Sequence, residues 1–588
     1  MHTVAPGCRL LLPQLSRRRF VQGMAGSAVL LSSMRGFSSG AEEHDRSVLV
    51  GPDYDLTIGE TTVNYTGRKR IATAVNGLVP APLLRMRQGA TVTIRVTNHL
   101  PVRSSIHWHG FILPADMDGV PGVSFTGIDP GSTFVYRFKV RQSGTYWYHS
   151  HSRFQEQTGL YGPIVIEPSG GERHGSDREY VVLLSDWSDA DPEWIYATLK
   201  RHSDYFNFGK RTIGNFLADV RARGLGETIA ARGSWGKMRM DPTDLADVGG
   251  ATYTYLMNGM TPAGNWTALF RRGERIRLRF INGSSMSFFD VRIPGLKLTV
   301  VAADGQDVEP VTVDEFRIGA AEVLDVIVAP STEQAYSIFA QSMDRSGYAR
   351  GTLAPQPGMK AEIPPLEPRV LLSMQDMGMG HDMAGMPGME HAGHHSGAPV
   401  GASAPLHPTT PAQFGPTVDM VAMQTGGRLD DPGPGLRANG RRVLTYADMH
   451  TLGGPIDQRG PGRDIELHLT GHMERFIWSF NGQKFSQAQP LRFTFGERLR
   501  VVLVNDSMMM HPIHLHGMWS EVEAEDGTFL VRKHTVSVQP AQRLSYLVTA
   551  DALGRWAYHC HLLYHMEAGM FREVVVEHPA GASGGEHA

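Results

Sequence analysis

The sequence predicts an all-β protein built from three β-sandwich domains, and three observations support this fold class. Gly (66) and Pro (36) are plentiful among the 588 residues, which favours turns and short strands over long helices. Apolar and polar residues alternate in short runs bounded by turn residues, as in strands with one buried face. One such run recurs three times, preceded by Gly and ended by Asn, at residues 90–98, 275–282 and 498–505. This recurrence, roughly 180 to 225 residues apart, predicts three related domains.

The alternation also places the domains along the chain. We expect the first sandwich over residues 46–170, the second over 175–355 and the third over 431–580. Between 356 and 430, Pro, Gly, Met and His replace the strand pattern, which is typical of a linker or loop. From Asp191 to about Arg223, apolar residues recur at loosely helical spacing. The second sandwich is therefore expected to carry a small helical insertion packed against it.

The N-terminus resembles an export signal. Arg17, Arg18 and Arg19 precede a short, weakly apolar run and then small residues before Glu42. This pattern is typical of a twin-arginine signal over residues 1–41, an address read by the twin-arginine export machinery. In a bacterium the mature protein would lie in the periplasm. We expect it to be soluble, because no later stretch approaches ~18 uninterrupted apolar residues.

Charge and cysteine content exclude two classes of protein. The formal net charge of -3 gives no electrostatic basis for binding nucleic acid. The only cysteines are Cys8, in the segment expected to be removed, and Cys560. The mature chain would keep one thiol, so a disulfide framework is excluded. A metal ion gives that thiol a role.

Histidines gather in four short clusters that are suited to metal binding. Residues i and i+2 of a strand point to the same face, so each His-x-His pair directs two imidazoles to one place. Imidazoles suit copper, and three copper ions with two or three ligands each would use all eight. The eight residues are His107, His109, His149, His151, His514, His516, His559 and His561.

Cys560 lies between two of these histidines, so its side chain leaves the strand on the opposite face. It would bind a different copper ion from His559 and His561, yet remain joined to both by a few covalent bonds. Two imidazoles, one thiolate and a distant thioether are the ligands of a blue-copper electron-transfer site. We expect that set to be His511, Cys560, His565 and, as a weak axial ligand, Met570.

The segments HWHG, HSH, HPIHLHG and HCHLLYHMEAGM, in this order, resemble the four copper-binding motifs of multicopper oxidases. The resemblance extends from about residue 48 to 578. It implies three cupredoxin domains, with the first and third holding three coppers at their interface. It also implies four copper ions: one type 1 ion at Cys560, one type 2 ion held by His107 and His514, and a type 3 pair held by the other six paired histidines. Dioxygen would be reduced to water at the three-copper cluster.

Reducing dioxygen to water also requires protons. Asp118 matches an acidic position that the family uses near the cluster, and a turn carboxylate before Gly119 is an equally weighted alternative. Other members carry an acid directly after the second type 1 histidine. Met566 stands there in this chain and Glu567 follows it, which leaves a relay at this point in question.

A second segment concerns the electron donor. Thioethers are soft ligands for Cu(I), and this methionine-rich stretch lacks the helical apolar partners of core methionines. Six methionines occur within residues 374–389, with four histidines in or just after the stretch: Met374, Met377, Met379, Met383, Met386, Met389, His381, His391, His394 and His395. We interpret the segment as a site for additional Cu(I).

The motifs together with this segment are most similar to the CopA/PcoA branch, the periplasmic copper-resistance oxidases. That resemblance implies oxidation of Cu(I) to Cu(II), in cooperation with other copper-resistance proteins of the cell envelope. Two alternatives stay open: a laccase-like oxidase that takes electrons from a small phenolic donor near His565, and a copper-sequestering protein without turnover. The complete thiolate ligand set disfavours the second alternative, because storage does not require it.

Overall fold

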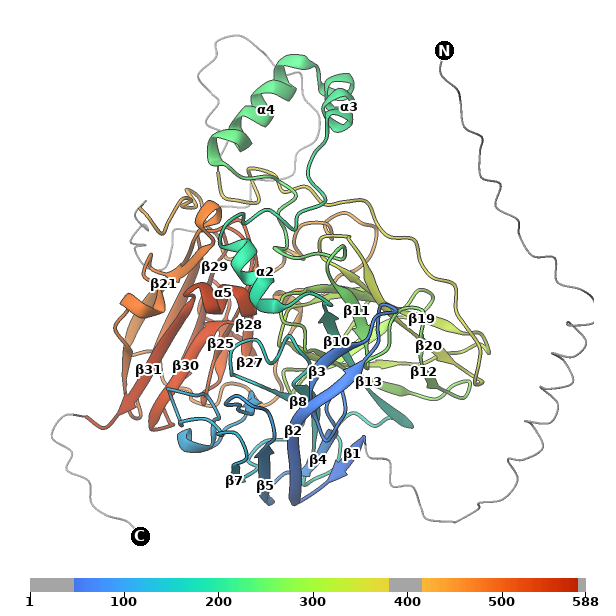
Figure 1. Cartoon of the computed structure of the whole chain (residues 1–588), viewed down its shortest axis with the longest axis vertical. Helices are drawn as coiled ribbons and strands as arrows, with labels where there is room; N and C mark the ends of the chain where they lie inside the picture. The colour runs from blue at the N-terminus through green and yellow to red at the C-terminus, as the bar shows by residue number, and fades with distance from the viewer. Residues whose placement is uncertain (1–46, 380–414, 580–588) are drawn as a thin grey trace, which may run out of the picture. The chain divides into compact units, whose positions relative to one another are not determined.

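A computed structural model describes residues 47–379 and 415–579 of the chain. Within these ranges six β-sheets form three consecutive sandwiches, and helices are few (Figure 1). The predicted all-β class with three sandwich domains is therefore confirmed. The expected signal segment, residues 1–41, and the methionines Met383, Met386 and Met389 lie outside the described residues.

The first sandwich pairs a four-stranded sheet with a five-stranded one. The four-stranded sheet has the order β3 (Arg70–Val75), β2 (Asp53–Val63), β5 (Thr91–Asn98), β7 (Thr133–Lys139). The five-stranded sheet has the order β1 (Val48–Val50), β4 (Leu83–Arg87), β9 (Tyr161–Glu167), β8 (Gly144–His149), β6 (His107–His109). In β5 every second side chain is buried, which is the predicted alternation.

The second sandwich pairs a six-stranded sheet with a five-stranded one. The larger sheet has the order β11 (Thr254–Met257), β10 (Arg178–Trp187), β13 (Ile276–Asn282), β18 (Val323–Val328), β15 (Leu298–Ala303), β16 (Gln306–Val313). The smaller sheet has the order β12 (Trp266–Leu269), β20 (Tyr348–Ala354), β19 (Tyr336–Ser342), β14 (Phe289–Arg292), β17 (Glu315–Ile318).

The third sandwich repeats this arrangement strand for strand. Its larger sheet has the order β22 (Ile477–Phe480), β21 (Arg463–His472), β24 (Arg498–Asn505), β29 (Arg543–Thr549), β26 (Ser520–Glu523), β27 (Phe529–Lys533). Its smaller sheet has the order β23 (Leu491–Thr494), β31 (Phe571–Glu577), β30 (Gly554–Cys560), β25 (His511–Leu515), β28 (Thr535–Val538). A short helix, α5 (Leu563–Ala568), connects β30 to β31.

Three asparagines make the same hydrogen bonds at equivalent positions of the three sandwiches. Asn98, Asn282 and Asn505 end β5, β13 and β24, and each is fully buried. Each side-chain Nδ2 donates to two backbone carbonyls, and each Oδ1 accepts from the backbone N–H two residues later. The amide group thus satisfies the backbone where each chain leaves the sheet.

The helical insertion exists but is longer than predicted. It contains α2 (Pro192–Leu199), α3 (Ile213–Arg223) and α4 (Leu225–Met238). Asp191 caps α2 by accepting from the Glu193 N–H, and a Thr212–Asn215 capping box starts α3. The expected packing holds only for α2, which buries Ile195 and Leu199, because α3 buries no side chain.

The segment between the second and third sandwiches forms no strand in its described portions. Short 3-10 turns occur near and within the third sandwich: η2 (Tyr446–Asp448), η3 (Met473–Arg475) and η4 (Phe485–Gln487). A further turn, η1 (Ala115–Met117), lies in the first sandwich, between β6 and β7.

Candidate metal centre

The expected thiolate set meets in the interior of the third sandwich. Strands β25 and β30 are antiparallel neighbours, with Ile513 opposite Cys560. The Cys560 Sγ lies 3.5 Å from His511 Nδ1 and 3.9 Å from His565 Nδ1. The two Nδ1 atoms are 3.2 Å apart, and all three residues are buried. One sulfur and two ring nitrogens therefore converge on one point.

Met570 is placed beside this point by backbone hydrogen bonds. The Cys560 N–H donates to the Met570 carbonyl (3.1 Å), and the Met570 N–H donates to the His565 carbonyl (3.0 Å). Its side chain is fully buried. The turn formed by α5 thus returns the chain to the end of β30, and this turn brings His565 and Met570 to the same place.

Three residues that sequence reasoning missed orient the two imidazoles. The His511 Nε2 lies 2.7 Å from Ser507 Oγ, and the His565 Nε2 lies 2.7 Å from Asp247 Oδ2. Trp478 stacks on the His565 ring, with centroids 3.9 Å apart. When Nε2 donates outward, Nδ1 keeps its lone pair toward Cys560. Ser507, Asp247 and Trp478 belong to no spacing motif, so the sequence offered no signal for them.

The eight paired histidines meet where the first sandwich contacts the third. His107 lies opposite His149 in the β6–β8 pair, and His514 lies opposite His559 in the β25–β30 pair. Across the contact, His151 Nε2 is 3.3 Å from His559 Nε2 and His149 Nε2 is 3.4 Å from His561 Nε2. All eight imidazoles are thus brought together, as the pairing pattern predicted.

The eight rings form three groups of three, two of which share His109, and each group has its ligand atoms within 4.8 Å of one another. The groups are His107, His109 and His514; His109, His149 and His561; and His151, His516 and His559. Each group combines residues of both sandwiches. None of these groups could form from one domain alone.

Most rings are fixed by a hydrogen bond from the nitrogen that faces away from the cluster, which defines the tautomer and aims the other nitrogen inward. The six contacts are His107 Nδ1 to Asp118 O (2.8 Å), His109 Nε2 to Thr535 Oγ1 (3.0 Å), His149 Nδ1 to Glu156 Oε2 (2.6 Å), His514 Nδ1 to His534 O (2.5 Å), His516 Nδ1 to Asp118 Oδ2 (2.9 Å) and His559 Nδ1 to Cys560 O (3.0 Å). Glu156, His534 and Thr535 were not anticipated from the sequence.

Asp118 lies at the cluster, between the two sandwiches. It follows η1 and is almost fully buried, with Oδ2 2.9 Å from His516 Nδ1 and Oδ1 3.3 Å from His107 Nδ1. Glu567 points elsewhere, to an ion pair with Arg153 at 2.5 Å. Of the two acids considered from the sequence, only Asp118 contacts the histidines.

Burial sets the protonation state of the centre. It lowers the pKa of seven cluster rings, and neighbouring histidines reinforce the effect in His109, His151 and His516. For His559 the pKa falls to about 4. Neutral imidazole is the form that binds metal ions. Burial also raises the pKa of the Cys560 thiol, so only a bound metal would keep it as thiolate at neutral pH.

The donor atoms fit copper. His107 Nε2, His109 Nδ1 and His514 Nε2 are buried and lack any hydrogen-bond partner among the described residues. An orphaned buried nitrogen is costly, and three that converge in one group are accounted for by a shared ion. Imidazoles with one thiolate are the donor set that copper prefers.

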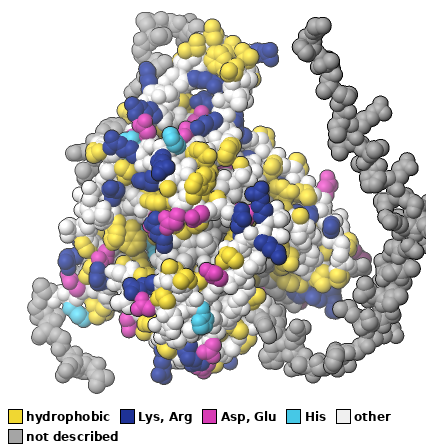
Figure 2. Space-filling view, viewed as in Figure 1, with side chains coloured by type: hydrophobic (Ala, Val, Ile, Leu, Met, Phe, Trp, Pro, Cys, Tyr) yellow, Lys and Arg dark blue, Asp and Glu magenta, His cyan; other side chains and the backbone are white. Residues whose placement is uncertain are grey.

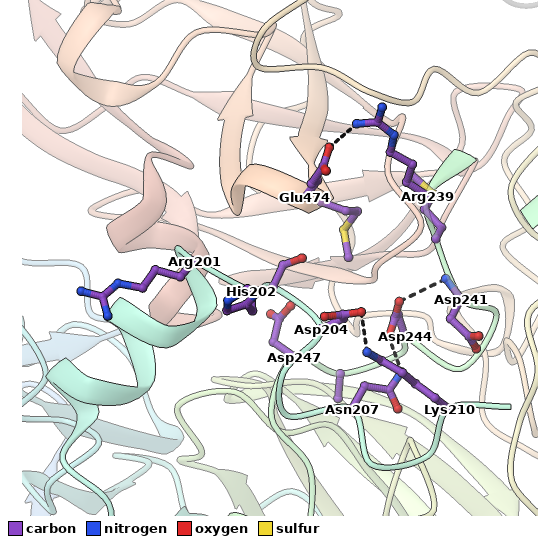
Figure 3. A pocket seen from close by; sticks show the side chains of 14 residues that line it. Arg201, His202, Asp204, Asn207, Lys210, Arg239, Asp241, Asp244, Asp247 and Glu474 are labelled. Carbon is purple, nitrogen blue, oxygen red and sulfur yellow. Dashed lines mark hydrogen bonds and ion pairs between the residues drawn. The ribbon is translucent and has the colours of Figure 1, made fainter. Parts of the chain in front are cut away.

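A cavity of about 630 Å³ lies next to the thiolate site, between the insertion and the third sandwich (Figure 3). Asp247 lines it and also holds His565. Acidic side chains of the insertion lie on one side and Glu474 on the other. Burial raises the pKa of Asp247 to about 8 and that of Asp244 to about 6. Met240 and Met473 also line the cavity.

Three methionines of the predicted Cu(I) segment lie within the described residues. Met377 is fully buried in the core, while Met374 and Met379 are half-buried against it. The segment approaches the insertion, since the Leu372 N–H donates to the Pro242 carbonyl (2.9 Å).

The chain belongs to the multicopper oxidase family, which matches residues 57–171, 178–357 and 458–580. It is therefore an oxidoreductase of a copper-dependent class. The chain is 58% identical to a copper resistance protein A homolog of Pseudomonas syringae pv. tomato, over 96% of this chain and 99% of that protein. It is 57% identical to copper resistance protein A of Escherichia coli, over 96% of this chain and all of that protein (100%). The resemblance to copper-resistance multicopper oxidases is thereby confirmed.

Solved structures agree on the fold. The crystal structure of Fet3p, described as a multicopper oxidase that functions in iron import, superposes with a TM-score of 0.62 at 18% identity, covering 90% of each chain. The laccase from Botrytis aclada gives 0.58 at 21% identity, covering 90% of this chain and 88% of that one. Among the described residues, no helix is both long and apolar enough to span a bilayer.

Proposed function

We propose that the protein is a periplasmic cuprous oxidase of copper resistance, which oxidises Cu(I) to Cu(II) and reduces dioxygen to water. The observation that carries the proposal is the contact between Asp247 and His565. It joins a cavity lined by carboxylates and thioethers directly to a ligand of the thiolate site.

The proposed copper ligands follow the groups of donor atoms. His511, Cys560, His565 and Met570 would hold the type 1 ion, and His107 with His514 the type 2 ion. The two remaining triads, His109 with His149 and His561, and His151 with His516 and His559, would hold the type 3 pair. The four bound ions would supply one-electron acceptance at the thiolate site and four-electron delivery to dioxygen at the cluster.

The chain itself provides the electron route between the two sites. Cys560 binds on one face of the strand end, and its direct neighbours His559 and His561 belong to two different triads. A few covalent bonds therefore separate the sulfur from both triads, so an electron would pass between the two sites through the bonded chain.

The composition of the cavity favours Cu(I) over a phenol. Asp204, Glu474 and Asp241 are ion-paired with Lys210, Arg239 and Arg211, which leaves Asp247 and Asp244 as the lining acids without a Lys or Arg partner among the described residues, beside the two methionines. Thioether sulfur binds soft Cu(I), and a carboxylate suits the Cu(II) product. A phenol ring would instead need a mostly apolar slot.

Asp118 is the proposed proton donor to the cluster. Its carboxylate contacts the outward nitrogens of His107 and His516, two rings that belong to different groups, so a bridging water would carry its proton to the position where oxygen would be reduced. The methionine-rich segment, residues 374–395, is proposed to bind additional Cu(I). Its role rests on Met374 and Met379 and on methionines outside the described residues, because Met377 serves the core.

Oxygen uptake by the purified copper-loaded protein would test the donor. We expect uptake with Cu(I), and the double variant Met240→Leu/Met473→Leu should raise the KM for Cu(I) by about tenfold, equal to about 1.4 kcal/mol. Leu preserves volume and removes only the sulfur. The control is Met423→Leu, at an exposed methionine that is not among the residues lining the cavity. An unchanged KM for Cu(I) in the double variant would reject the cavity as the donor site.

The laccase-like alternative predicts a different result for the same double variant. If a phenol were the natural donor, the double variant would impair phenol oxidation as much as Cu(I) oxidation. Copper sequestration without turnover would appear as copper binding with no oxygen uptake from either donor.

Fractionation of cells that express the full chain would test the periplasmic location and export through the twin-arginine machinery. Co-purification from the envelope would test for copper-resistance partners.

A further inference from the structure

Helices α3 and α4 form a hairpin that stands apart from the sheets (Figure 1). Gly224, with φ of +89°, joins the two helices directly. Arg232 of α4 pairs with Asp219 of α3 at 2.9 Å and lies over the Phe216 ring. The hairpin is thus held by its own contacts. Of its residues, α3 buries none and α4 buries only Thr228 and Trp235.

The outer face of this hairpin is aliphatic. Ile213 and Leu217 lie one turn apart on α3, with 82% and 51% of their surfaces exposed. Leu225 and Ile229 lie one turn apart on α4, each 55% exposed. Residues i and i+4 share a helix face, so each helix presents a pair. Figure 2 shows hydrophobic side chains gathered over the hairpin, with basic side chains beside them. A contiguous exposed aliphatic patch of this kind indicates a binding surface.

The charge of the hairpin differs in sign from that of the chain. Between residues 210 and 239 stand seven Lys and Arg residues and only two acids, Asp219 and Glu227, whereas the whole chain carries a net charge of -3. Arg221 and Lys237 are exposed. The other five form ion pairs: Lys210 with Asp204, Arg211 with Asp241, Arg239 with Glu474, and both Arg223 and Arg232 with Asp219. Arg221 and Lys237 therefore carry the positive charge beside the aliphatic patch.

We propose that the α3–α4 hairpin docks on an anionic lipid surface. The four aliphatic side chains enter the headgroup boundary, and Arg221 and Lys237 contact lipid phosphates, as in amphipathic interfacial helices. The patch sits on a projecting hairpin and not in a groove, which suits a bilayer because a bilayer requires no shape complementarity. Lys210 and Arg239 at the two ends of the hairpin also line the cavity beside Asp247. Docking would bring the mouth of that cavity close to the membrane.

Co-sedimentation with lipid vesicles tests the proposal, using the mature copper-loaded protein. We expect it to bind vesicles of mixed phosphatidylcholine and phosphatidylglycerol at least about tenfold more tightly than pure phosphatidylcholine, with binding weakened by added salt. The variant Ile213→Ser/Leu217→Ser/Leu225→Ser/Ile229→Ser should lose this binding and keep its oxygen uptake in solution. Each of Arg221→Gln and Lys237→Gln should weaken binding about fivefold.

The control is Ile71→Ser/Ile456→Ser, which removes two isoleucines that are 60% and 59% exposed on other surfaces. It should bind vesicles like the unaltered protein. Equal binding by the four-fold hairpin variant, or no binding by the unaltered protein, overturns the proposal. If the unaltered protein binds washed envelopes only until they are treated with protease, the hairpin recognises a protein and the lipid proposal is also overturned.

Discussion

The second and third sandwiches share one strand order, yet among the described residues only the third contributes to the metal-ligand groups. The strand register shows which residue of the second sandwich corresponds to each residue of the third. His511 pairs with Val538 as Phe289 pairs with Ile318, and Asn505 and Asn282 bond the carbonyls of those two partners.

By the same reasoning Cys560, opposite Ile513, corresponds to Ala340, opposite Val291. The second sandwich therefore offers the same position for a thiolate site and fills it with Phe289 and Ala340. The fold provides the geometry, and a few side chains at the strand ends decide the chemistry.

The second sandwich uses nearby buried positions for an ion cluster instead. Asp290 is fully buried and contacts Arg317 at 2.7 Å and Arg345 at 2.5 Å. Burial alone would raise the pKa of Asp290, but the two guanidinium groups outweigh burial and hold it below its usual value. Buried charge here serves structure, while buried neutral imidazole in the third sandwich leaves lone pairs for metal.

The most severe test makes the third sandwich resemble the second at one residue. Cys560→Ala should abolish the blue absorption and reduce oxygen uptake to background, because no other thiolate is available. Copper analysis should find one ion fewer than in the unaltered protein. Retained oxygen uptake with Cu(I) would contradict the proposed role of the thiolate.

A change in the second sandwich should lower stability and leave the activity unchanged. Arg317→Leu removes a bidentate partner of Asp290 and should lower the free energy of unfolding by about 3–5 kcal/mol. Urea unfolding measures this loss. Oxygen uptake per bound copper should be unchanged, because Arg317 contacts no proposed ligand. A parallel loss of specific activity would show that the two sandwiches are not separable in this way.

Acid should destabilise the copper-free protein through its histidines. Burial lowers the folded-state pKa of His559 and His534 to about 4, against about 6.5 when unfolded. Below about pH 6.5 the unfolded chain takes up protons first, so stability is lost progressively as the pH falls to about 4, by at most about 3 kcal/mol per residue. Thermal melting at pH 7 and pH 5, with and without copper, checks this. Equal melting of the copper-free protein at both pH values would argue against it.

The smallest expected effect concerns the support of one ligand. Ser507→Ala removes the acceptor for His511 Nε2 and should weaken copper at the thiolate site by about tenfold, with a shift in the blue absorption. Competition with a copper chelator measures the affinity. The matched control is Ser342→Ala in the second sandwich, whose buried hydroxyl bonds the backbone of Gly347 and not a proposed copper ligand. A blue site indifferent to Ser507→Ala would show that packing alone orients His511.

Local rules were enough to predict which side chains this fold brings together. Alternation along a strand predicted that His559 and His561 would point one way and Cys560 the other, because side-chain direction depends only on the neighbouring backbone. The Gly-to-Asn runs predicted the threefold repeat, because the buried Asn performs the same backbone task each time.

Local rules could not predict contacts between side chains that are far apart in the sequence. Asp247 and His565 are 318 residues apart in sequence, and only the packing of the insertion against the third sandwich joins them. Helix α4 was missed because Gly226, Gly233 and Gly236 weaken its helical pattern, and burial of Trp235 helps hold it. The same pattern reading also overestimated how much of α3 faces the core.

Contacts across the cluster have a consequence for the order in which the protein matures. His151 meets His559 across 408 residues, and His149 meets His561 across 412. A growing chain carries only one or two rings of each triad until its last strands are made and have closed against the first sandwich. Until then no triad is complete, so we expect the proposed copper ions of the cluster to bind only after the first and third sandwiches have met.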